Sequence, residues 1–152
     1  MKIVLVDPKI PPNTGTIARL CAANYLQLDL VGDLGFSLDD KQLKRAGLDY
    51  WPEVEYRHFP DRERYMDSLD TEKSFLFTTK TETSYTEAKF SEDSVLVFGS
   101  ETTGLSESYL KKYSECCYTI PMANPNIRSL NLSNSVSIVV YEALRQIVSW
   151  EN

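Results

Sequence analysis

Short apolar runs alternate along the chain with segments of helical periodicity, and this alternation limits the fold more than any other feature. The apolar runs span Ile3–Val6, Leu28–Val31, Val54–Phe59, Ser74–Thr79, Ser94–Gly99 and Tyr118–Met122. The helix-like segments span Thr14–Asn24, Asp39–Ala46, Asp61–Leu69, Ser106–Tyr113 and Leu132–Trp150. Several runs are continuously apolar, as in strands that helices cover on both faces. We therefore predict an α/β fold with a mainly parallel sheet, built as one domain over residues 1–152.

The first and last helices carry the clearest signals. Asn13 or Thr14 can cap the exposed amides of the first helix, after two prolines that stiffen its approach. Arg19 lies off the apolar stripe of that helix and is free to point elsewhere. A broad apolar stripe along the last helix predicts packing on the sheet, on a partner chain, or on both.

The net charge of −6 bears on the choice of partner. Proteins that bind nucleic acid usually carry a surplus of basic residues. An RNA site here therefore has to be a local basic patch, or has to be assembled from two chains. No stretch approaches the ~18 apolar residues of a membrane span, and the N-terminus is too poor in apolar residues for a signal peptide. We expect a cytoplasmic protein without a membrane segment.

Cysteine and histidine usage argues against disulfides and metals. The three cysteines, Cys21, Cys116 and Cys117, are odd in number, and two are adjacent. With a single histidine, His58, and no C-x-x-C motif, we expect no metal site.

The segment 95–106, VLVFGSETTGLS, reads as a strand that enters a glycine-containing turn and then a helix. Gly99 and Gly104 allow the backbone of this turn to approach a ligand closely. The segment fits neither a Walker A loop nor a dinucleotide-binding glycine motif. An ordinary strand-to-helix turn remains open, and Glu101 is either a helix N-terminal acid or a functional carboxylate.

Two further segments combine loops with helix starts. In residues 118–143, polar groups recur at Asn131, Ser133, Asn134 and Ser137, more than one cap requires. This surplus suits a polar ligand, or a buried turn that needs its backbone groups satisfied. Residues 10–23 form either a phosphate-binding helix N-terminus or simply a well-capped first helix.

In this order, the three segments resemble the motifs of the SPOUT RNA methyltransferases. The matching residues are N-T-G-x-I-A-R-x-C near the start, F-G-x-E-x-x-G-L in the middle, and I-P-M followed by R-S-L-N-L-S-N-S-V-S-x-x-x-Y-E-A near the end. Together with residues 36–51, the short chain resembles the tRNA wobble-position ribose 2′-O-methyltransferases of the TrmL/YibK type. The resemblance covers nearly the whole chain, although the loop 123–129 is one residue longer than is usual in the family.

The resemblance implies a SPOUT α/β-knot fold, in which helices flank a parallel sheet and the C-terminal part forms a trefoil knot. Such a knot is a rare exception to the rule that chains do not thread loops. The resemblance also implies that S-adenosylmethionine binds in the knot, mainly through main-chain groups. By motif position, the residues expected around it are Phe77, Thr78, Gly99, Glu101, Gly104, Ile120, Met122, Ser129 and Leu130.

The catalytic residues implied are Arg19, Asn13, Asn131 and Tyr141, within a homodimer that has the last helix at its interface and an RNA site shared between subunits. Because a guanidinium stays protonated near neutral pH, Arg19 is a poor base. It is better suited to stabilise a developing alkoxide or to hold a phosphate. Asn13 and Asn131 would orient Arg19 and the loops. Tyr141 either serves activity or merely packs in the helix.

The implied substrate is the anticodon stem-loop of tRNA, methylated at nucleotide 34, a cytidine or modified uridine. The residues proposed to contact RNA are Lys41, Lys44, Arg45, His58 and Lys80, with Arg57, Arg62 and Arg64 as further candidates. Acids outnumber bases over residues 39–67, so a solvated face of mixed charge is the alternative. Alternatives for the whole protein are methylation of another tRNA or rRNA site, and a catalytically silent RNA-binding protein.

Overall fold

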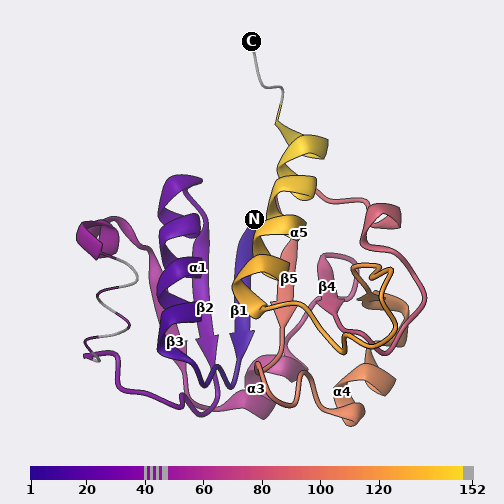
Figure 1. Cartoon of the computed structure of the whole chain (residues 1–152), viewed down its shortest axis with the longest axis horizontal. Coiled ribbons are helices and arrows are strands. Elements are labelled where there is room, and N and C mark those ends of the chain that lie inside the picture. Colours follow the sequence, from indigo (N-terminus) through magenta and orange to yellow (C-terminus); the bar gives the residue numbers. More distant parts are fainter. Residues whose placement is uncertain (40, 42, 44, 46–47, 149–152) are drawn as a thin grey trace.

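A parallel sheet forms the centre of the computed structural model, which describes residues 1–39, 41, 43, 45 and 48–148 (Figure 1). Within these residues the sheet has six strands, in the order β3-β2-β1-β5-β4-β6. Their bounds are β1 Lys2–Val6, β2 Gln27–Val31, β3 Tyr56–Phe59, β4 Ser74–Phe77, β5 Val95–Phe98 and β6 Cys117–Tyr118. All neighbouring strands pair in parallel, which confirms the predicted sheet.

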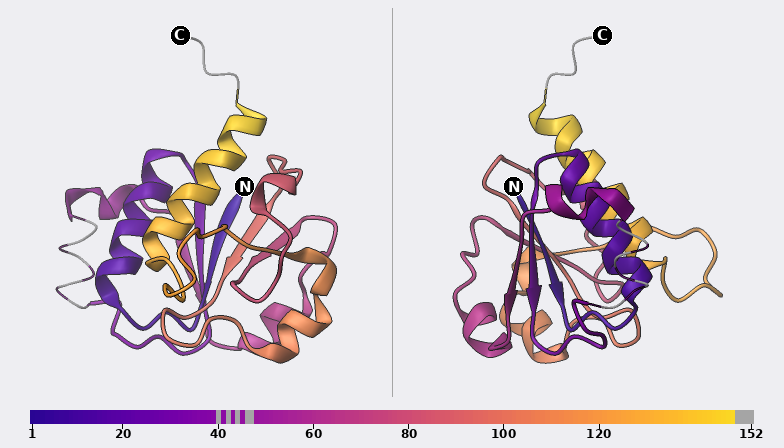
Figure 2. Two further views of the ribbon diagram at one scale, coloured as in Figure 1. Left: turned by 45° about the vertical axis from the view of Figure 1, so that its right-hand side comes forward. Right: turned by 90° about the vertical axis from the view of Figure 1, so that its left-hand side faces the viewer.

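Helices cover both faces of this sheet, as the continuously apolar strands predicted (Figure 2). The bounds of the α-helices are α1 Pro11–Ala23, α3 Arg62–Asp67, α4 Glu107–Lys112 and α5 Leu132–Ile147. Helices α1 and α5 pack side by side on one face, and their buried residues form one apolar core with the strands. Residues of α3 and α4 form a second core on the other face. The predicted α/β layer architecture is therefore confirmed.

The N-terminus of α1 differs from the prediction. The helix begins at Pro11 rather than Thr14, and its N-cap, Ile10, makes no side-chain capping hydrogen bond. Proline at the first helical position lacks an N–H that would be unpaired there, and its φ already suits a helix. The prediction that Asn13 or Thr14 caps this helix is wrong, since both lie inside it.

Strand β6 is also shorter than the predicted run Tyr118–Met122. After Tyr118 the backbone leaves β4 and bonds to residues 83–85 instead. The Thr119 amide donates to the Thr83 carbonyl at 2.8 Å, and the Thr119 carbonyl accepts from the Tyr85 amide at 2.8 Å. Residues 119–131 then form a long loop that leads into α5.

Other parts of the structure also differ from the predicted helices and strands. Of the predicted helix Asp39–Ala46, residues 40, 42, 44 and 46 lie outside the described residues, and residues 41, 43 and 45 are helical. A 3-10 helix, η1 Leu48–Glu53, precedes β3, and two others span η2 Tyr85–Glu87 and η3 Ser114–Cys116. The three cysteines form no disulfide, as predicted, and all three are buried. In the described part of the chain, no helix is both long and apolar enough to span a membrane. The trefoil knot and the single-domain organisation stay predictions.

Packing between α1, α5 and the sheet predicts the effect of a cavity on stability. Ile17 in α1 is fully buried in this core. Ile17→Ala should lower the free energy of unfolding by about 2–5 kcal/mol, because removal of the larger side chain creates a cavity between the packed layers. Thr16→Ala, one residue away on the exposed side, should change it by less than about 0.5 kcal/mol. Urea unfolding at one protein concentration measures both, and equal effects would contradict the packing described.

Candidate functional site

A cavity of about 560 Å³ opens where β4 and β5 end. It lies beyond the carboxyl ends of parallel strands, the edge at which open α/β sheets bind their ligands. The structure brings together all nine residues predicted to surround the cofactor. They are Phe77, Thr78, Gly99, Glu101, Gly104, Ile120, Met122, Ser129 and Leu130.

The turn after β5 forms one wall of this cavity. It folds back on itself, with Ser100 bridged to Gly104 and the Gly104 amide donating to the Ser100 carbonyl at 2.8 Å. A Cβ atom at Gly99 would lie 2.2 Å from the Gly104 carbonyl carbon and from the Leu105 nitrogen. Gly104 has a φ of +66°, in the left-handed region that favours glycine, yet a Cβ there would meet no atom within 4 Å. Gly99 is therefore required because residues 104 and 105 pack directly against it, whereas Gly104 is favoured by its backbone conformation.

Glu101 joins this turn to the start of α1. One carboxylate oxygen accepts from the Lys9 amide at 2.8 Å. The other accepts from the Ile10 amide at 3.0 Å and from the side-chain amide of Asn13 at 3.2 Å. The carboxylate thus satisfies backbone donors ahead of a helix whose own N-cap side chain cannot. Glu101 bonds to the loop before α1 and not to the start of α4, so the alternative of an acid at the N-terminus of the following helix is wrong. A functional role for this carboxylate stays a prediction.

Asn13 and Asn131 extend this network to α5. The Asn131 side-chain amide donates to Asn13 Oδ1 at 3.0 Å. Asn131 Oδ1 caps α5, accepting from the amides of Ser133 at 2.9 Å and Asn134 at 3.3 Å, and from the Ser133 hydroxyl. Three segments far apart in sequence are therefore joined through side chains. This arrangement agrees with the prediction for the loops. Arg19, which the two asparagines were also predicted to orient, instead lies against the Tyr50 ring.

Arg19 lies away from the cavity. It is exposed on α1, and its guanidinium carbon lies 4.9 Å from the centre of the Tyr50 ring. Six residues separate it from Asn13, which places the two on different sides of a helix with 3.6 residues per turn. Tyr141 is 52% exposed on α5, so its side chain does not pack in the core. Within the described chain, neither residue lines the cavity.

The predicted RNA contacts are spread over the surface. Lys80 lines the cavity, and its Nζ lies 3.5 Å from Oε1 of Glu107. Lys41 and Arg45 are exposed, and Lys44 lies outside the described residues. The imidazole Nε2 of His58 lies 3.0 Å from the Gly32 carbonyl oxygen, and this ring is exposed at the end of β3. Only Lys80 of the described set adjoins the cavity.

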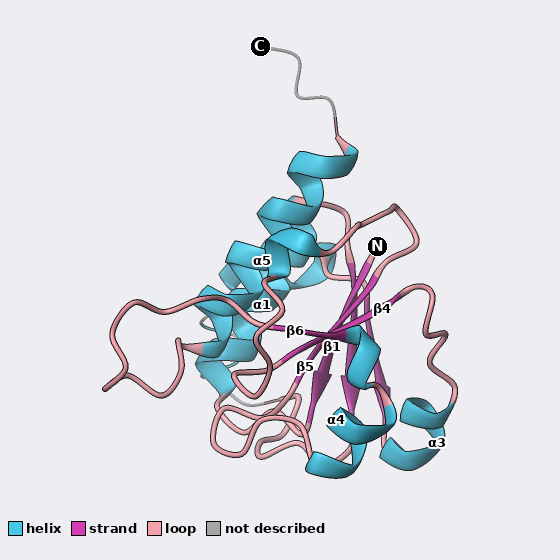
Figure 3. Ribbon diagram, turned by 90° about the vertical axis from the view of Figure 1, so that its right-hand side faces the viewer, coloured by secondary structure: helices cyan, strands magenta, loops and turns pink. Residues whose placement is uncertain are grey.

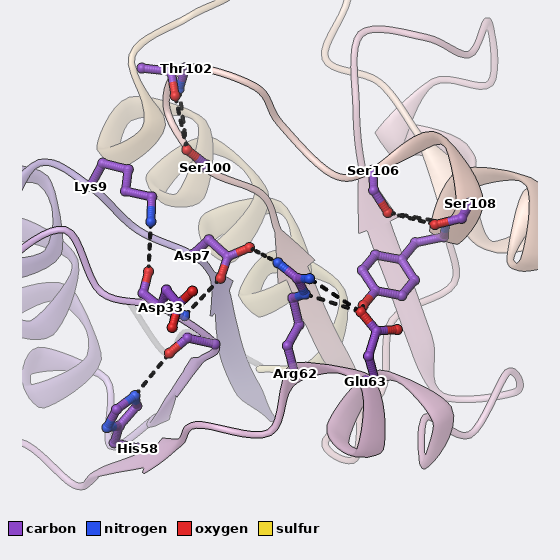
Figure 4. A network of polar contacts seen from close by, with 12 residues as sticks. Asp7, Lys9, Asp33, His58, Arg62, Glu63, Ser100, Thr102, Ser106 and Ser108 are labelled. Carbon is purple, nitrogen blue, oxygen red and sulfur yellow. Dashed lines mark hydrogen bonds and ion pairs between the residues drawn. The ribbon is translucent and has the colours of Figure 1, made fainter.

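A second polar network, centred on Asp7, holds the start of the loop between β1 and α1 (Figure 4). Asp7, with a φ of +50°, accepts from the Asp33 amide at 2.8 Å and from Arg62 Nη1 at 2.6 Å. This hydrogen bond raises the pKa of Arg62 further above its ordinary value. The Tyr109 hydroxyl donates to Glu63 at 2.7 Å, and burial, then this bond, raise the pKa of Tyr109 to about 12. The charge of Arg62, a candidate RNA contact, is therefore engaged within the fold.

Sequence reasoning missed several residues of the site. Arg128, Thr79 and Ser135 line the cavity, and Asp7 anchors the loop beside it through Arg62, which the sequence suggested only as an RNA contact. Arg128 directly precedes the predicted Ser129, so the motif itself signalled its position. The Asp7–Arg62 pair is separated by 55 residues, and no local pattern marks it. No group of three or more potential metal ligands occurs among the residues that the structure describes.

The model of the SpoU rRNA Methylase family matches residues 1–141. The chain belongs to this family. It is 48% identical over 145 residues to the tRNA (cytidine(34)-2′-O)-methyltransferase of Methylovorus glucosotrophus, covering 95% of this chain and 94% of that protein. A solved structure described as giving structural insights into the 2-OH methylation of C/U34 on tRNA is 42% identical, with a TM-score of 0.88, and the alignment covers 95% of this chain and 94% of that one.

A more distant family member shares the fold. The SpoU methyltransferase AviRb of Streptomyces viridochromogenes, solved in complex with the cofactor AdoMet, is 23% identical with a TM-score of 0.83. The match covers 96% of this chain and 57% of AviRb. The match shows that this chain has the SpoU fold.

The two glycines of the cavity wall provide a matched test of its geometry. Gly99→Ala should lower the free energy of unfolding by about 3 kcal/mol or more, because a methyl group collides with backbone that cannot move separately. Gly104→Ala should lower the free energy of unfolding by only about 1–2 kcal/mol. An alanine is strained at this left-handed φ, but its methyl group would meet no other atom. Chemical denaturation of both variants checks this order. A reversed order would contradict the folded-back turn.

Proposed function

We propose that this protein transfers a methyl group from S-adenosylmethionine to the ribose 2′-hydroxyl of nucleotide 34 in tRNA. The observation that carries the proposal is the cavity at the ends of β4 and β5, which gathers every predicted cofactor residue. Support comes from relatives of nearly equal length that are named tRNA (cytidine(34)-2′-O)-methyltransferases. We expect the anticodon stem-loop to be the part of tRNA that binds, because bases of an unpaired loop are easier to reach.

The residues of the cavity fit S-adenosylmethionine. The volume of the cavity, about 560 Å³, lies within the range of roughly 300–1,000 Å³ typical of small-molecule sites. Phe98, Leu105 and Ile120 offer apolar surface for an adenine ring, and backbone groups of the turn 99–105 offer polar partners. When bound, the cofactor supplies an activated methyl group on a sulfonium. The chain's own contribution is to hold this group and the ribose in line, which supplies much of the rate enhancement of a transfer reaction.

The ribose hydroxyl has to lose its proton as it attacks. Arg19 is suited to stabilise the negative charge that develops on the oxygen, since a guanidinium donates hydrogen bonds and does not accept protons near neutral pH. Arg19 does not line the cavity of its own chain. We therefore infer that it reaches the cavity of a second copy, in a homodimer whose interface includes α5. Exposed Tyr141 and half-buried Ile138 on that helix support this arrangement.

Methyl transfer to defined tRNA transcripts tests the proposed substrate. Enzyme, labelled S-adenosylmethionine and a tRNA transcript should give one 2′-O-methyl group at nucleotide 34. A transcript with a 2′-deoxyribose at that nucleotide should accept none, because the attacking oxygen is missing. Methylation that persists on the deoxy transcript would place the target at another tRNA site, and methylation of rRNA alone would favour the rRNA alternative. Cofactor binding without transfer to either RNA would favour a catalytically silent protein.

Substitution of Arg19 tests its proposed role. Arg19→Ala should lower kcat by about 100-fold or more while leaving the calorimetric affinity for S-adenosylmethionine unchanged, as expected for a group that stabilises charge only in the transition state. Tyr50→Ala is the matched control, because it removes the ring that Arg19 covers but keeps the guanidinium. That control should retain most of the activity. Equal losses in the two variants would mean that Arg19 acts through packing on Tyr50.

A further inference from the structure

Arg128 stands at the edge of the cavity on the loop between β6 and α5, residues 119–131. This loop projects from the face of the molecule that α1 and α5 cover (Figures 2 and 3). The side chain of Arg128 is exposed, yet it lines the same cavity as Gly99 and Ile120. It can therefore touch both the contents of the cavity and a large ligand lying over its mouth.

The charges around the cavity make Arg128 distinctive. Three of the described lining residues are charged: Lys80, Glu101 and Arg128. Glu101 is occupied by the loop before α1, and Lys80 lies 3.5 Å from Glu107. Arg128 has no carboxylate partner among the residues that the structure describes. A chain with a net charge of −6 thus keeps an unpaired cation at this cavity.

The backbone on either side of Arg128 is held by hydrogen bonds. Asn124 accepts twice, its side-chain oxygen from the Asn126 amide at 3.0 Å and its carbonyl from the Ile127 amide at 3.2 Å. Three residues beyond Arg128, Asn131 is fixed by its bonds to Asn13 and to the first turn of α5. Ordering of the flanking backbone lowers the entropic cost of placing a guanidinium against a ligand.

An unpaired guanidinium is suited to bind an oxyanion, and two oxyanions can reach this place: a phosphodiester of RNA and the carboxylate of the cofactor. The phosphodiester fits better. Arg128 is exposed rather than enclosed, and S-adenosylmethionine carries a net positive charge that an unpaired arginine repels unless an anion lies nearby. We propose that Arg128 binds a phosphodiester beside the ribose that is methylated, and so positions the RNA over the cavity. This inference rests on the function proposed above.

Arg128→Ala and Arg128→Lys test this role, with Lys73→Ala as the matched control. Lys73 also carries an exposed positive charge, but it precedes β4, about 13 Å along the strand from the cavity end. For each protein we would measure the KM for tRNA with saturating S-adenosylmethionine, the salt dependence of tRNA binding, and the calorimetric Kd of S-adenosylmethionine without RNA.

Arg128→Ala should raise the KM for tRNA about tenfold, as expected when one charge-assisted contact is lost. It should also make the slope of log affinity against log salt shallower by about 0.7–0.9, the value of one phosphate contact. Its cofactor Kd should equal that of the wild type. Arg128→Lys should recover the salt slope and only part of the KM, because it keeps the charge without the planar fork. Lys73→Ala should match the wild type in all three measurements.

Three results would overturn the inference. A KM and salt slope of Arg128→Ala equal to those of Lys73→Ala would show that Arg128 does not meet the RNA. A weakened cofactor Kd with unchanged tRNA binding would assign Arg128 to the cofactor carboxylate. If the wild type itself transfers no methyl group to tRNA, the proposed function fails first and this inference fails with it.

Discussion

The carboxylate of Glu101 is the interaction on which the site depends. It accepts the Lys9 and Ile10 amides and the Asn13 side chain, and so fixes the loop that leads into α1 against the turn that follows β5. Asn13 in turn holds Asn131, the cap of α5. A carboxylate bonded to several donors is a strong acceptor, and loss of one member leaves its partners without these hydrogen bonds. The cavity is therefore shaped by a network whose members are separated by as many as 118 residues along the chain.

This network also explains why a polar loop cluster can remain ordered at the edge of the sheet. Loops with few apolar contacts order only when their backbone groups find partners. Here Asp7 and Arg62 hold the loop before α1 from one side, and Glu101 holds it from the other. The apolar cores between the helices and the sheet supply stability, whereas the polar bonds set the positions of the loops. The division agrees with an enzyme that needs a rigid frame around a bound cofactor.

The sequence predicted those features that depend on local periodicity. The strands covered on both faces, the buried stripe of α5 and the glycine turn after β5 each follow from patterns within about ten residues. The predicted start of α1 is wrong because Pro11 and Pro12 form its first turn instead of preceding it. The bond of Glu101 to the loop before this helix also has no local signal, since Glu101 lies 88 residues beyond Asn13. The nine cavity residues came from the family resemblance, since no periodicity relates Phe77 to Ser129. Arg19 was assigned the same way, and its place on α1, over Tyr50, is a tertiary contact that spacing cannot give.

The central claim is that the cavity and its network serve methylation of the ribose of nucleotide 34. The most direct measurement is mass spectrometry of total tRNA, digested and mapped to the anticodon, from cells with and without the gene for this protein. Loss of the 2′-O-methyl group from nucleotide 34 of at least one tRNA, with its return when the gene is restored, is the predicted result. Ribose methylation at nucleotide 34 that is identical in the two strains for every tRNA would contradict the account.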